Sequence, residues 1–128
     1  IEENYFPGLK VAIGIIKSPK TFEELLIQEC AEILKSSNLE NFNDTVLVVG
    51  TSVGGMNQTE KFFLQDGDYK RVDPEYHNIN ALVKILSNKY SFLNDISFST
   101  ACTSSANALG YAYEVIKKGI YKNALVVG

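Results

Sequence analysis

Two continuous apolar runs constrain the fold of this chain more than any other feature. Thr45–Gly50 and Ala124–Gly128 are short, rich in valine and leucine, and both end in Val-Val-Gly. A strand with one face in water alternates apolar and polar residues, whereas a strand with few polar residues is covered on both faces. The pattern therefore predicts a sheet with helices on both sides.

The rest of the chain alternates between strand-like and helix-like segments. Strands are expected at 9–16, 45–50, 95–100 and 124–128, and helices at 22–36, 58–64, 79–90 and 103–118. Strands that alternate with helices are typical of an α/β fold, in which helices cover a sheet.

The helix expected from Phe22 to Ser36 has a clear start signal. Thr21 and Glu24 have the spacing of a capping box, in which each side chain bonds the other residue's backbone N–H. Cys30 lies on the apolar stripe of this helix, where a free cysteine is usually a packed core thiol.

The helix expected near the end of the chain also has an apolar stripe. Leu109, Ala112, Tyr113 and Ile116 recur at helical spacing, so we expect them to lie on one face of the helix. Gly119 suits the position just past the end of this helix, where a left-handed backbone is common.

Composition excludes several classes of function. The 128 residues suit one domain, and the net charge of −3, with scattered basic residues, gives no electrostatic footprint for nucleic acid. No apolar run approaches the ~20 residues that cross a bilayer. A single histidine excludes a histidine-rich metal site, and we expect neither a metal nor a cofactor. Two cysteines without a Cys-x-x-Cys pair fit a reducing compartment, which favours the cytoplasm.

The ends of the chain suggest an incomplete domain. The sequence opens without methionine, close to an apolar run, and stops inside a predicted core strand. We therefore expect residues 1–128 to be a piece of a longer protein.

The turn after the first long apolar run is rich in glycine but lacks a nucleotide-binding pattern. Gly50, Gly54 and Gly55 match neither the Walker pattern, which needs Gly-Lys-[Ser/Thr], nor the Rossmann spacing. A tight turn that needs positive φ accounts for much of this signal. His77, the single histidine, could activate a cysteine, but its position favours a surface or partly buried residue near a helix start.

Cys102 is the candidate for chemistry. It lies between a predicted strand and a predicted helix, so its sulfur is expected at a helix N-terminus. The unpaired N–H groups and the macrodipole there favour a thiolate, which is the nucleophilic form, and the same N–H groups could donate to an oxyanion. The alternative from spacing alone is a structural cysteine, with Thr103, Ser104 and Ser105 acting as helix caps.

The residues around Cys102 resemble a known family. The stretch Thr100-Ala-Cys-Thr-Ser-Ser-Ala-Asn-Ala-Leu-Gly110 is similar to the active-site cysteine motif of β-ketoacyl-acyl-carrier-protein synthases. Val46–Met56 resembles the strand and glycine turn of that family, Gly67–Pro74 its variable loop, and Tyr121–Gly128 the strand after the nucleophile helix. The resemblance implies the N-terminal half of a thiolase-like fold, with a mixed sheet covered by helices.

The resemblance also implies a reaction. In this family a cysteine, here Cys102, takes an acyl chain from a phosphopantetheine thioester on an acyl carrier protein, before decarboxylative condensation with the malonyl thioester in fatty-acid or polyketide synthesis. The family's two catalytic histidines and its lysine belong to the second half, so we expect this chain alone to be inactive. The family also forms homodimers, and Ile96–Thr100 is the expected pairing strand.

A second hypothesis belongs to a different class of function. The chain could come from a noncatalytic member of the same family, used as an acyl-carrier-binding module or as the partner subunit of a condensing enzyme. Carrier binding without malonyl decarboxylation by the full-length protein would favour this hypothesis.

Overall fold

The structure is a computed structural model that describes residues 20–39 and 42–128. The strand expected at 9–16 lies outside the described residues. The other expected strands and helices are all present, although some of their bounds differ from the expectation.

A three-stranded parallel sheet forms the centre of the described fold. Its strands are β1 (Thr45–Gly50), β2 (Asn94–Phe98) and β3 (Asn123–Val127), in the order β2-β1-β3. Strand β1 is buried over its whole length, as its apolar sequence predicts. The α/β class is confirmed, and the antiparallel strand that a mixed sheet would need is not among these three strands.

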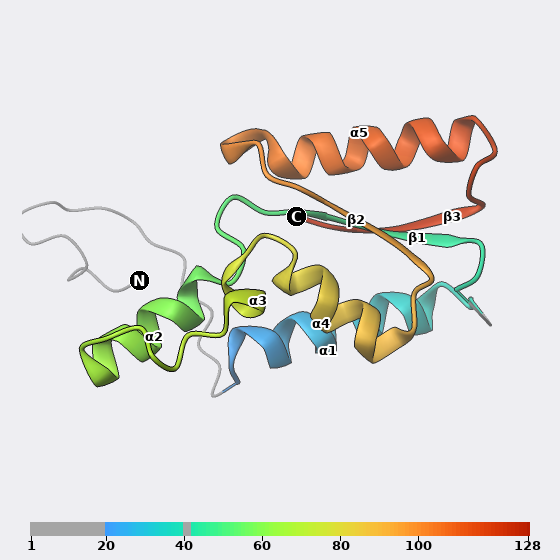
Figure 1. Ribbon diagram of the computed structural model, residues 1–128. Helices are drawn as coiled ribbons and strands as arrows, with labels where there is room; N and C mark the ends of the chain where they lie inside the picture. The colour runs from blue at the N-terminus through green and yellow to red at the C-terminus, as the bar shows by residue number, and fades with distance from the viewer. Residues whose placement is uncertain (1–19, 40–41) are drawn as a thin grey trace, which may run out of the picture.

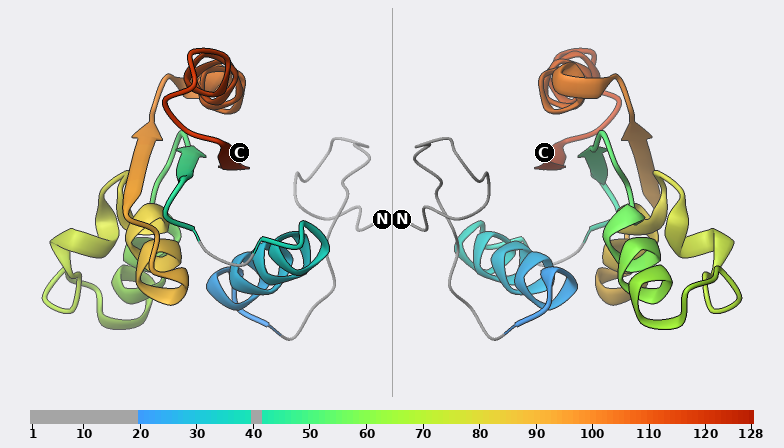
Figure 2. Two further views of the ribbon diagram at one scale, coloured as in Figure 1. Left: turned by 90° about the vertical axis from the view of Figure 1, so that its right-hand side faces the viewer. Right: turned by 90° about the vertical axis from the view of Figure 1, so that its left-hand side faces the viewer.

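Helices cover both faces of this sheet, as Figures 1 and 2 show. Helices α1 (Phe22–Ser36) and α4 (Ala81–Tyr90) lie on one face, and α5 (Ser104–Lys117) lies on the other. Because side chains of a strand alternate between faces, β1 contributes to two cores. Leu47 and Val49 pack on the α1 and α4 side, whereas Val46 and Val48 pack against α5.

The capping box of α1 is present. The Glu24 backbone N–H donates to Thr21 Oγ1 at 3.2 Å, and the Thr21 N–H donates to Glu24 Oε2 at 2.7 Å. The latter bond stabilises the carboxylate and lowers the pKa of Glu24. Cys30 of this helix is buried in the core, as predicted.

Several bounds differ from the sequence-based expectation. Helix α2 (Met56–Asp66) is longer than the predicted 58–64, and α4 begins two residues later than predicted. Strand β2 ends at Phe98 rather than at residue 100, because the chain turns before Cys102. His77 is exposed, as expected; it is the last residue of α3 (Pro74–His77), a helix of only four residues, and lies shortly before α4.

The four residues expected on one face of α5 differ in burial. Ala112 is buried, but Leu109, Tyr113 and Ile116 are exposed. The face that meets the sheet carries Ser104, Ala108, Ala112 and Val115 instead. The helix lies so close to β1 that small side chains fill the interface, and the large apolar residues therefore point away from it.

This orientation of α5 predicts that the same substitution has unequal effects on stability at two adjacent positions. Ala108→Gln should lower the free energy of unfolding by about 1–3 kcal/mol, because position 108 is fully buried against β1. Leu109→Gln should change it by no more than about 0.5 kcal/mol, because 63% of Leu109 is exposed. Urea unfolding of the two variants would measure both effects, and a larger loss from the substitution at position 109 would contradict the described orientation.

Candidate active site at the start of helix α5

The candidate site lies at the carboxyl edge of the parallel sheet. The chain leaving β1 passes through α2 and α3 to α4 on one face, whereas the chain leaving β2 runs to α5 on the other face. In open α/β sheets, ligands bind in the crevice where successive connections diverge in this way. The two strand exits are joined by a hydrogen bond from the Thr51 N–H to the Phe98 carbonyl, at 2.9 Å.

The glycine-rich turn after β1 is explained by close packing. Thr51 Oγ1 accepts hydrogen bonds from the N–H groups of Val53 and Gly54, and Gly54 has a φ of 55°. A Cβ at Gly55 would lie 1.5 Å from the carbonyl oxygen of Tyr76. The interpretation as a tight turn with positive φ is confirmed, and the absence of side chains at Gly54 and Gly55 also lets the segment from Tyr76 to Ile79 lie against this turn.

Two further glycines form a platform under the first turn of α5. A Cβ at Gly50, the last residue of β1, would lie 2.4 Å from the carbonyl oxygen of Ser104 and 2.8 Å from Cα of Ser105. A Cβ at Gly128, just past β3, would lie 2.6 Å from Cβ of Ser105. The start of α5 therefore touches the ends of both strands (Figure 1). We call Gly50 and Gly128 the glycine platform.

Cys102 lies immediately before this supported turn. It is the middle residue of the short 3₁₀ turn η1 (Ala101–Thr103), which leads directly into α5, and it is exposed. The strand-to-helix position expected from the sequence is confirmed. Ala101 has a φ of 53°, in the left-handed region that non-glycine residues rarely occupy, so the chain turns sharply just before the cysteine.

Ser104 holds this turn from inside. Its hydroxyl accepts from the Thr100 N–H at 2.9 Å and donates to the Ala101 carbonyl at 2.7 Å. The residue is only 3% exposed. One buried hydroxyl thus bridges the two residues that precede Cys102 and satisfies their backbone groups, which would be costly to bury unpaired.

The second cysteine is in a different environment. Cys30 is 3% exposed, and burial, with a smaller contribution from the charge of Glu29, raises the pKa of its thiol. Burial thus disfavours the nucleophilic thiolate of Cys30 and blocks access to it. Of the two thiols, only Cys102 is open to a reagent or substrate.

The structure does not bring His77 together with Cys102. His77 Nδ1 is 2.7 Å from Thr59 Oγ1 of α2, and the His77 side chain lines an apolar groove of about 890 Å³ along that helix. Val53, Met56 and Phe63 also line the groove, whereas Cys102 does not. The described neighbours of His77 are therefore Thr59 and the groove residues, and Cys102 is not among them.

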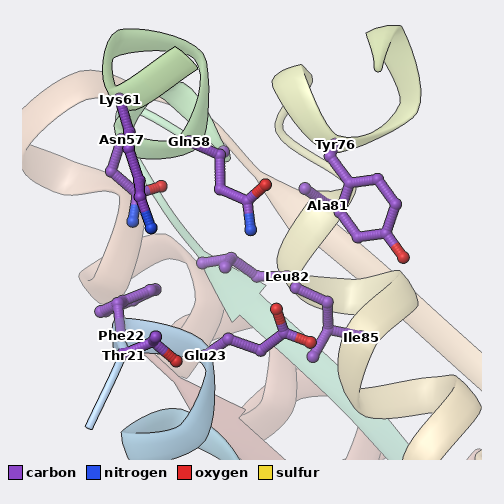
Figure 3. Close-up of a pocket in the computed structure, with 11 residues that line it drawn as sticks. Thr21, Phe22, Glu23, Asn57, Gln58, Lys61, Tyr76, Ala81, Leu82 and Ile85 are labelled. Carbon is purple, nitrogen blue, oxygen red and sulfur yellow. The ribbon is translucent and has the colours of Figure 1, made fainter. Parts of the chain in front are cut away.

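A smaller cavity of about 240 Å³ lies between α1, α2, α3 and α4 (Figure 3). Asn57, Gln58 and Lys61 of α2 face Phe22 of α1 and Leu82 of α4 across it. Helices α1 and α4 cover the sheet face opposite to α5, and Cys102 is not among the residues that line the cavity.

Two classes of site find no support in the part of the chain that the structure describes. Within residues 20–39 and 42–128, no group of three or more His, Cys, Asp and Glu side chains is gathered as metal ligands would be. No helix in these ranges is long and apolar enough to cross a membrane.

Sequence reasoning identified Cys102 but missed the residues that support it. Ser104 was considered only as a possible cap, although its hydroxyl bridges two backbone groups. The roles of Gly50 and Gly128 were also missed. Their signal was present, because the two apolar runs end in the same Val-Val-Gly and lie side by side in the sheet.

The glycine platform leads to a prediction with an internal control. Gly50→Ala should destabilise the protein by about 1–3 kcal/mol and slow the alkylation of Cys102, because the added methyl group meets backbone atoms of the α5 start. Gly110→Ala should stabilise it by roughly 0.5–1 kcal/mol, because Gly110 lies inside α5 with open space beside it. Denaturant unfolding measures the stability of the two variants, and the kinetics of iodoacetamide labelling measure the reactivity of Cys102. Equal stability of the two variants would contradict the close contact between Gly50 and the start of α5.

Comparison with known proteins identifies the family. The family model "Beta-ketoacyl synthase, N-terminal domain" matches residues 17–128, which is most of the chain. No curated protein and no solved structure matches the chain. The family that the residues around Cys102 resemble is therefore confirmed: the chain belongs to the β-ketoacyl synthase family and corresponds to its N-terminal domain.

Proposed function

We propose that Cys102 is the acyl acceptor of a β-ketoacyl-acyl-carrier-protein synthase. The observation that carries this proposal is the exposed thiol at the strand-to-helix junction of a chain that belongs to this family. The supported turn and the open thiol favour Cys102 as the reactive residue, and the family membership supplies the class of reaction.

The proposed step is a thioester exchange. The Cys102 thiolate attacks the carbonyl carbon of an acyl thioester on the phosphopantetheine arm of an acyl carrier protein. The tetrahedral intermediate carries its negative charge on oxygen, to which the backbone N–H of Cys102 donates. The bond to the pantetheine sulfur then breaks, the carrier leaves as a thiol after taking up a proton, and the acyl chain remains on Cys102.

The surroundings of Cys102 suit nucleophilic attack better than a buried position would. It precedes α5, a helix of 14 residues, whose first turn presents positive partial charge toward the preceding segment. The small side chains of Ala101, Ser105 and Ala106 beside it are exposed, so a thioester can approach the sulfur. Both cysteines are free, which suits the reducing cytoplasm that we propose as the location.

Two partners belong to this proposal. The first is the acyl carrier protein that supplies the acyl chain. The second is another copy of the protein, paired through β2. This strand is at one end of the described sheet, where its only described strand neighbour is β1. Among the described strands none pairs with its other edge, and the backbone groups of such an edge can pair between subunits.

We assign the condensation step to the longer protein to which this N-terminal domain belongs, which we call the parent protein. Decarboxylation of the malonyl group requires further catalytic groups near the acylated cysteine, and His77 is engaged with Thr59 on α2. We therefore expect this chain alone to form no β-ketoacyl product.

The proposal predicts a covalent intermediate on one of the two cysteines. When the parent protein is incubated with an acyl carrier protein that bears a short acyl thioester, peptide mass mapping should locate the acyl group on the peptide containing Cys102. Cys102→Ala should abolish the adduct, and Cys30→Ala, the matched control, should retain it because Cys30 is buried.

Two results would count against the proposal. An adduct that survives Cys102→Ala would assign the chemistry to another residue. Tight carrier binding with neither an adduct nor malonyl decarboxylation would instead favour the noncatalytic partner subunit.

A further inference from the structure

A second set of hydrogen bonds crosses the outer side of the turn before Cys102. Asn107 Nδ2, from the second turn of α5, donates to Thr100 Oγ1 at 2.7 Å. Thr103 Oγ1 donates to the Thr100 carbonyl at 2.7 Å and lies 3.0 Å from Thr100 Oγ1. Thr100 is thus held by its side chain and its backbone at once. We call Thr100, Thr103 and Asn107 the outer clamp.

The outer clamp spans a strained residue. Ala101 follows Thr100 with a φ of 53°, a conformation that costs an alanine about 1–2 kcal/mol. Such residues persist only where the surrounding structure fixes them more than once. Ser104 fixes Ala101 from the buried side, and the outer clamp fixes the preceding residue from the exposed side. Cys102 is the next residue along the chain.

The two sides contribute differently. Ser104 is part of the buried interface, so its loss would affect folding as well as the position of the cysteine. Thr100, Thr103 and Asn107 are exposed, and hydrogen bonds between exposed side chains add little to global stability. The outer clamp therefore restrains local geometry more than it stabilises the fold. Reaction rates depend on such geometry, because a displacement of about 1 Å can cost roughly a hundredfold.

We propose that Asn107 is a positioning residue for Cys102. By holding the Thr100 hydroxyl, it fixes the left-handed backbone at Ala101 and thereby directs the Cys102 sulfur toward the acyl carbonyl. Asn107 itself acts through Thr100 and does not touch the acyl group. This inference rests on the proposed function, because the position of the sulfur matters only if Cys102 receives the acyl chain.

The test compares four forms of the parent protein: wild type, Asn107→Ala, Thr100→Val and the double variant. Single-turnover acylation of Cys102 is measured over a range of acyl-carrier concentrations. In Asn107→Ala, the rate constant at saturating carrier should fall about tenfold or more, whereas the carrier concentration at half-saturation should not change. In Thr100→Val this rate constant should fall by a similar factor. The double variant should be acylated no more slowly than the slower single variant, because both substitutions remove the same hydrogen bond.

Thermal unfolding separates positioning from a loss of structure. The melting temperature of Asn107→Ala should stay within about 4 °C of wild type, since Asn107 is exposed. Lys118→Ala is the matched control, because it removes an exposed ion pair with Glu114 at the opposite end of α5. Its acylation rate should equal that of wild type.

The possible failures are distinguishable. If wild-type Cys102 takes an acyl group but Asn107→Ala is acylated at the wild-type rate, the positioning role is overturned and the proposed function stands. The positioning role would also be overturned if the loss of acylation rate in the double variant equalled the product of the losses in the two single variants. If the wild-type protein takes no acyl group on Cys102, the proposed function fails, and the positioning role fails with it.

Discussion

The first turn of α5 lies against the ends of β1 and β3 with no room for a side chain between them. A Cβ at Gly50 or at Gly128 would come within 2.6 Å of atoms in Ser104 or Ser105. This contact fixes where the helix begins, and with it the place where the chain must turn after β2. The strained backbone at Ala101 and the exposed position of Cys102 follow from that requirement. The glycine platform is therefore the feature on which the candidate site depends.

The same close approach explains why small residues form the inner face of α5. Ala108 and Ala112 fill the narrow space above Val46 and Val48, whereas a leucine or tyrosine would force the helix away from the sheet. A helix displaced in this way would lose its contact with the glycine platform. The position of the cysteine and the composition of the inner face are thus two consequences of one short distance between α5 and the sheet.

Local signals in the sequence predicted much of the fold. The apolar runs predicted β1 and β3, Thr21 and Glu24 predicted the start of α1, and the strand-to-helix change predicted the place of Cys102. These features succeed because each depends on residues that are close together in the chain. Burial of Cys30 was also predictable, since it lies on the apolar stripe of a helix with a well-defined start.

Features that depend on contacts distant in the sequence were not predicted. The sequence does not indicate which face of α5 meets the sheet, because the inner face is decided by how closely the helix approaches β1 and not by the size of Leu109 or Tyr113. Gly50 contacts Ser104 more than fifty positions later in the chain, so its role becomes visible only in three dimensions. Asn107 and Thr100 are only seven positions apart, but their hydrogen bond depends on the sharp turn at Ala101, which no local pattern in the sequence indicates.

The central claim is that one of the two thiols is presented for acylation and the other is buried. Its most direct test is the alkylation of both cysteines by iodoacetamide in the native parent protein, with and without prior exposure to an acyl-carrier thioester. We expect that Cys102 alone is alkylated, that acylation protects it, and that hydroxylamine, which cleaves thioesters, restores the reaction. Alkylation at Cys30 in preference to Cys102, or alkylation of Cys102 that the acyl thioester does not reduce, would contradict the proposed role of Cys102.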